Sequence, residues 1–146
     1  MGGLGLNTEE LILLMRKEQE SAETQGLSGK VELRGDVVGL NLTRSASPKR
    51  TAVISSPGDR WISLEVDSGF SQDHFEEDIP DDEFREEVER LVQLAIVYLG
   101  QGGRVQRVRV KGFETLVVAF RGKDEVLRRS WAKSLRAMLT HPRMNI

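Results

Sequence analysis

The sequence contains no cysteine among its 146 residues. Disulfides, thiolate metal sites and cysteine nucleophiles are therefore excluded, and a reducing compartment is favoured. Only two histidines are present, His74 and His141, and no Gly-x-Ser-x-Gly motif accompanies them. Serine hydrolase chemistry consequently has no support in the sequence. We expect a protein without catalytic residues.

Glycine-rich phosphate loops are also missing. The glycine cluster at residues 100–103 follows a helical pattern and precedes a strand pattern. Phosphate-binding loops run in the opposite order, from a strand into a helix, so this cluster is better explained as a helix end. We expect no cofactor.

Long apolar segments are absent as well. The longest nearly unbroken apolar run, residues 91–99, is far shorter than the roughly 20 residues of a membrane-spanning helix. The first ten residues have neither the basic nor the apolar part of a secretory signal. We expect a cytoplasmic protein, with residues 1–6 disordered or foreign to the natural chain.

The composition predicts one folded domain over residues 1–146, with 38% hydrophobic and 30% charged residues. An N-cap at Asn7 begins a helix to about residue 24, and strand patterns follow at residues 30–34, 37–44, 51–55 and 60–66. A second helix spans residues 82–99, and a hairpin turns at Lys111 and Gly112. A final helix begins near residue 123. Its inward apolar positions are Leu127, Trp131, Leu135, Met138 and Leu139.

Short turns join most of these strands, which predicts an α+β fold: a mostly antiparallel sheet with helices packed on one face. The expected order is α-β-β-β(-β)-α-β-β-α. In this order, from the strand at residues 61–66 through the helix at 82–99 to the hairpin at 104–120, the chain resembles the small α/β chaperones of bacterial type III secretion and their relatives. That resemblance implies a homodimer through the apolar helix at residues 91–99.

Charge is distributed very unevenly along the chain. Residues 65–90 contain twelve acidic and two basic residues, whereas residues 104–146 contain eleven basic and three acidic ones. The acidic segment includes residues 67–80, which we interpret as a long acidic loop. Such a loop can hold a hard cation, although residues 67–78 lack the ligand spacing of an EF-hand. It can equally be a solvated surface with Phe70 and Phe75 in the core, or a binding surface.

The basic region offers a second interpretation, nucleic-acid binding. Its candidate residues are Arg107, Arg109, Lys111, Lys123, Arg128, Arg129, Lys133 and Arg136. Aromatic stacking partners are few there, and basic side chains that pair with the protein's own acids explain the same pattern. We consider nucleic-acid binding less probable than protein binding.

The density of carboxylates favours a non-enzymatic module that binds a basic partner protein, because a concentrated charge steers an opposite one. We expect a bacterial immunity-type or antitoxin-like inhibitor of a toxin; the alternative is a chaperone-like dimer that binds a client segment. No metal ion and no membrane contact are expected. The expected contacts are Asp67, Phe70, Asp73, Phe75, Glu76, Glu77, Asp78, Asp81 and Asp82.

Overall fold

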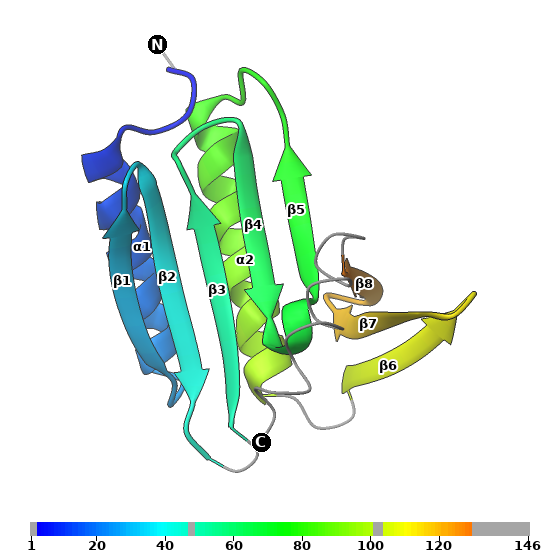
Figure 1. Cartoon of the computed structure of the whole chain (residues 1–146). Coiled ribbons are helices and arrows are strands. Elements are labelled where there is room, and N and C mark those ends of the chain that lie inside the picture. Colours follow the sequence, from blue (N-terminus) through cyan, green and yellow to red (C-terminus); the bar gives the residue numbers. More distant parts are fainter. Residues whose placement is uncertain (1–2, 47–48, 101–103, 130–146) are drawn as a thin grey trace.

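A computed structural model describes residues 3–46, 49–100 and 104–129 (Figure 1). In this part of the chain, two α-helices and eight strands form an α+β fold with a single antiparallel sheet. The fold class predicted from the sequence is therefore confirmed. The strands follow the spatial order β1-β2-β3-β4-β5-β8-β7-β6.

The elements alternate between helices and runs of hairpin-connected strands. Their bounds are α1 Thr8–Glu23, β1 Ser28–Arg34, β2 Val37–Arg44, β3 Arg50–Ser56, β4 Trp61–Val66, a 3-10 turn η1 Asp67–Gly69, β5 Ser71–Phe75, α2 Asp81–Gly100, β6 Val105–Val110, β7 Phe113–Phe120 and β8 Lys123–Arg128. The first helix begins as expected, because the Asn7 side chain and the Glu10 side chain cap each other's backbone amides.

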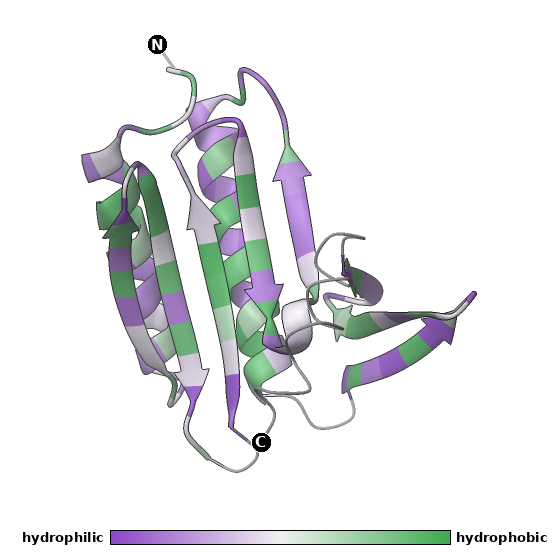
Figure 2. Cartoon of the chain, in the orientation of Figure 1, coloured by the Kyte–Doolittle hydropathy of each residue, from purple (hydrophilic) through white to green (hydrophobic). Residues whose placement is uncertain are grey.

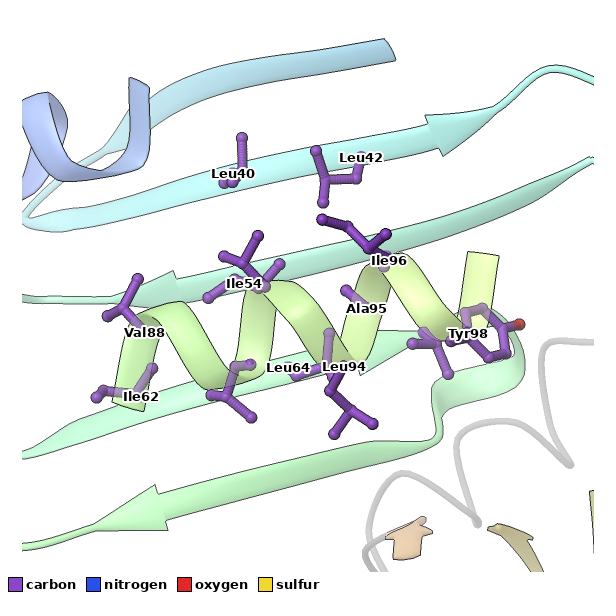
Figure 3. Close-up of a cluster of buried hydrophobic side chains, with 14 of the residues drawn as sticks. Leu40, Leu42, Ile54, Ile62, Leu64, Val88, Leu94, Ala95, Ile96 and Tyr98 are labelled. Carbon is purple, nitrogen blue, oxygen red and sulfur yellow. The ribbon is translucent and has the colours of Figure 1, made fainter. Parts of the chain in front are cut away.

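Strands β1 to β5 form a meander that carries the core on one face. Leu40 of β2 lies opposite Ile54 of β3, and Ile54 lies opposite Leu64 of β4. These three side chains are fully buried, and Figure 3 shows Ile54 and Leu64 next to α2. Helix α1 packs on β1 and β2, and α2 packs on β2, β3 and β4. Both helices therefore cover the same face of the sheet.

The second meander, β6 to β8, continues the sheet through a single residue pair, Ser71 of β5 with Arg128 of β8. Its inner face contributes Leu116, Val118 and Leu127 to the common core, and β7 contacts α2. The expected hairpin at Lys111 and Gly112 is confirmed. In Figure 1, β6 and β7 lie to one side of the first meander.

Two expectations about elements were wrong. Residues 71–75 form β5 instead of belonging to a loop, and residues 123–128 form β8 instead of beginning the final helix. Arg121 and Gly122 both have positive φ, as in the tight turn of a β-hairpin, and this turn sends the chain back along β7. The remainder of the expected final helix lies outside the described residues.

Residues 3–6 belong to the segment that we expected to be disordered or foreign to the natural chain, and in the structure they contact the fold. Leu6 is buried in the core, and its amide donates to the Gly58 carbonyl at 2.7 Å. Gly58 has a φ of +105°, and a side chain there would lie 2.3 Å from the Leu6 carbonyl oxygen. Only glycine permits this close approach of the two backbones.

Candidate functional site

Strand β5 brings two of the expected contact residues to one face of the sheet. Asp73 lies opposite Ser63 and Phe75 lies opposite Trp61, on the face that points away from the helices. The Asp73 carboxylate accepts a hydrogen bond from the Ser63 hydroxyl, and Phe75 is 75% exposed. Figure 2 shows that β5 is hydrophilic over most of its length, unlike β2 to β4. An aromatic ring is thus displayed beside a carboxylate on a regular strand.

The turn that follows β5 is held by backbone hydrogen bonds. The Glu76 amide donates to the Arg60 carbonyl at 2.9 Å, and the Gly5 amide donates to the Ile79 carbonyl at 2.8 Å. Ile79 is buried. Glu77 and Asp78, both exposed, lie between these fixed points and line a shallow hollow with the exposed Leu4. Their carboxylates are therefore presented by an ordered backbone.

Asp81 and Asp82 lie in the first turn of α2. The Asp82 carboxylate accepts a hydrogen bond from the Glu83 amide at 2.9 Å. Acidic groups at this end of a helix are stabilised by the exposed amides of the first turn. These two residues have a structural role whether or not they contact a partner. We call the set Asp73, Phe75, Glu76, Glu77, Asp78, Asp81 and Asp82 the acidic edge.

Two of the expected contact residues are engaged within the fold, Asp67 as a partly buried side chain and Phe70 as a fully buried one. The Asp67 carboxylate accepts hydrogen bonds from the Thr51 amide at 3.1 Å and from the Tyr98 hydroxyl at 2.6 Å. Burial of Tyr98, and then its hydrogen bond to Asp67, raise the pKa of the Tyr98 phenol. Phe70 is fully buried beneath the guanidinium of Arg129, 4.5 Å from the centre of its ring. Asp67 and Phe70 are structural, so we remove them from the site.

The structure also reveals a polar network that sequence reasoning missed. Arg90 of α2 donates to Gln72 of β5 at 2.6 Å and to Glu125 of β8 at 3.0 Å, and it also contacts Glu87. His74 Nδ1 lies 2.9 Å from Glu87 Oε2. This network ties α2 to the two strands where the meanders meet. One weak signal of this network is visible in the sequence, because Arg90 is one of only two basic residues within the acidic segment, residues 65–90.

The environment of His74 explains why Glu76 is less free than its neighbours. The distance from His74 Nε2 to Glu76 Oε1 is 3.5 Å. His74 Nε2 is buried and makes no hydrogen bond of good geometry. A carboxylate at this position is the acceptor that a protonated Nε2 would use. Glu76 is therefore oriented toward the protein, whereas Glu77 and Asp78 are oriented outward.

The basic residues do not form one open surface in the described part of the chain. Arg107 lies 3.6 Å from Glu114, and Lys123 lies 3.4 Å from Glu125. The Arg129 guanidinium donates to the Ser68 carbonyl at 2.8 Å while it covers Phe70. Lys133 and Arg136 lie outside the described residues. Several of the candidate nucleic-acid contacts are thus engaged with the protein itself.

The apolar end of α2 is covered within the chain. Its apolar residues from Leu91 to Leu99 are all buried except Val97, which is partly buried. The sheet covers this helix on β2 to β4, and β7 covers it further. Elements of the same chain therefore cover this helix, and the homodimer through residues 91–99 that the resemblance implies stays a prediction.

Comparison with protein-family models, with curated proteins and with solved structures found no match for this chain. Neither described helix has the length and apolar character that crossing a membrane requires. The described residues contain no group of three or more His, Asp or Glu side chains arranged to hold a metal ion.

Proposed function

We propose that this protein is a cytoplasmic, non-enzymatic inhibitor of the immunity or antitoxin type, which binds a basic partner protein through the acidic edge. The observation that carries the proposal is the exposed ring of Phe75, which lies on the same strand face as Asp73 and is followed in the chain by the exposed Glu77 and Asp78. An aromatic side chain exposed to this degree on a regular strand loses water-accessible apolar surface when a partner covers it.

The carboxylates of the acidic edge contribute to the choice of partner and to the rate of association. In the described part of the chain no cation lies within 4.0 Å of Glu77 or Asp78. Unpaired charge at the rim of an interface steers an oppositely charged partner and raises the association rate. An ordered backbone under these side chains also lowers the entropy lost on binding. A toxin that acts on nucleic acid has the basic surface that such an edge complements.

Affinity capture with a matched pair of charge reversals tests the proposal. The test variant is Asp73→Lys with Glu77→Lys, and the control is Glu20→Lys with Asp36→Lys, which places the same charge change on exposed positions elsewhere. We expect the wild-type chain and the control to capture the same basic protein from lysate of the source organism, and the test variant to fail.

Kinetics with the captured protein then separate specific binding from nonspecific attraction. Surface plasmon resonance should show an association rate that falls about tenfold or more as salt rises from low to physiological concentration. Capture by the test variant equal to capture by the control would overturn the proposal.

A further inference from the structure

The backbone of β5 has two edges, and only one is fully occupied. The Val66 amide donates to the Phe70 carbonyl, and the Glu76 amide donates to the Arg60 carbonyl. Both pairs share the register of the β4–β5 ladder. Hydrogen-bonded pairs alternate along an antiparallel ladder, so Gln72 and His74 bond to β4. The amides and carbonyls of the odd-numbered residues point to the opposite edge.

Strand β8 occupies this opposite edge at one position alone, Ser71 with Arg128. A continued ladder would offer the Val126 carbonyl to the Asp73 amide. That carbonyl instead accepts from Gln72 Nε2 at 3.2 Å, and β8 diverges from β5. Among the described strands, none pairs with Asp73 or Phe75 at this edge, so their outward backbone amides and carbonyls lack a ladder partner there.

We propose that an extended segment of the basic partner adds to this edge of β5 as a further strand. Strand addition satisfies the four open backbone groups of Asp73 and Phe75. It also places one partner side chain beside Asp73 and another beside Phe75 on the outer face. The fitting segment carries Lys or Arg at the first of these positions and an apolar residue at the second, separated by one residue.

This inference rests on the proposed function and specifies how the partner is recognised. Charge selects β5 over the other exposed edges of the sheet. The edge strand β1 carries Lys30, Glu32 and Arg34 on its outer face, with Glu32 within 3.4 Å of both cations. The edge strand β6 carries Arg107 and Arg109. Among the strands that the structure describes, β5 alone combines an open backbone edge with neighbouring exposed carboxylates and an exposed ring.

Amide hydrogen exchange of the full chain, followed by NMR, tests whether the edge is open. The amides of Asp73 and Phe75 should exchange rapidly, whereas those of Gln72 and His74, on the same strand but bonded to β4, should be protected. Slow exchange at Asp73 and Phe75 in the free monomer would show that the edge is already covered. A dimer in light scattering with the same protection would assign the edge to a second copy. Either result overturns the inference.

A phage-displayed library of random linear peptides, selected on the full-length chain, tests the occupant. Enriched peptides should carry Lys or Arg and an apolar residue two positions apart, and binding should protect the Asp73 and Phe75 amides. Enrichment of acidic peptides, or no enrichment, overturns the inference. N-methylation along an enriched peptide should abolish binding at every second residue, because alternate amides face β5.

A pair of variants at one position separates strand addition from charge attraction. Asp73→Ala and Asp73→Pro both remove the carboxylate, but only proline removes the outward amide, which pairs with no described strand. Strand addition predicts that Asp73→Pro binds an enriched peptide about tenfold more weakly than Asp73→Ala. Equal affinities, with binding still lost on charge reversal, overturn strand addition and leave the proposed function standing. Binding that is insensitive to charge reversal overturns both.

Discussion

The side-chain amide of Gln72 donates to the backbone carbonyl of Val126 at 3.2 Å, in the place where a neighbouring strand would supply a backbone amide. The same Nε2 group lies 3.2 Å from Glu125 Oε1, and Gln72 Oε1 accepts from Arg90. A single side chain thus ends the β5–β8 ladder and connects it to α2. The junction of the two meanders depends on polar contacts more than on strand pairing.

Replacing Gln72 should weaken this junction. Gln72→Leu leaves the Val126 carbonyl without its donor and removes one acceptor from Arg90, and unsatisfied buried groups of this kind cost about 1–3 kcal/mol. The free energy of unfolding, measured by urea denaturation, should fall by that amount. Gln106→Leu, at an exposed position on β6, is the control and should change stability by less than about 0.5 kcal/mol. Equal effects of the two changes would contradict the structural role of Gln72.

Glu125, at the centre of this network, should stabilise the fold at neutral pH. Burial alone would raise its pKa, but the hydrogen bond from Gln72 and the charges of Arg90 and Lys123 outweigh burial, so the pKa is lowered. A lowered pKa contributes stability that is present above the ordinary glutamate pKa and is lost as pH falls through the folded-state value. Glu125→Gln should therefore lower the melting temperature at pH 7, with a deficit that shrinks toward acidic pH. A deficit that grows on acidification would contradict the assignment.

Glu18 of α1 should behave in the opposite way. Its side chain is buried, and burial followed by repulsion from Glu89 raises its pKa. Because the pKa is raised in the folded state, the free energy of unfolding carries no penalty from Glu18 below the ordinary glutamate pKa. It declines as pH rises from there through the folded-state pKa. Glu18→Gln should raise the melting temperature at pH 7, and the gain should vanish at low pH. Thermal melts of Glu18→Gln and Glu125→Gln over the same pH series check this. Each variant is the control for the other, because the same substitution is expected to change the melting temperature in opposite directions at pH 7.

Sequence reasoning predicted the strands with apolar inner faces and missed the two without them. In β4 the buried residues Ile62, Leu64 and Val66 alternate cleanly with less buried ones, so the strand was predicted within one residue. In β5 the inward positions are Gln72 and His74, and in β8 one of them is Glu125. Strands are predicted from apolar residues at every second position. In β5 and β8 residues of the polar network occupy inward positions, so this pattern is missing.

The candidate site was predicted in part for the same reason. The cluster of acidic residues in the sequence indicated the acidic edge. The spacing of these residues along the chain does not show which carboxylates are bound by other groups of the fold. Asp67 is bonded to Thr51 and Tyr98, which lie 16 and 31 residues from it in the sequence. Phe70 and Phe75 lie at opposite extremes of burial, because the turn η1 directs the first ring inward and β5 carries the second on its outer face. Tertiary contacts alone make this distinction.

The exposed ring of Phe75 should contribute much of the affinity for the partner and little to stability. Phe75→Ala should weaken binding of the captured basic protein about 30-fold, which corresponds to about 2 kcal/mol for a central aromatic anchor. The melting temperature should remain close to that of the wild type, because the ring is 75% exposed in the free chain. Phe113→Ala is the matched control, since Phe113 is 62% exposed on the distant strand β7. Isothermal titration calorimetry of both variants decides the matter: equal losses of affinity would show that general exposed apolar surface, and not the acidic edge, holds the partner.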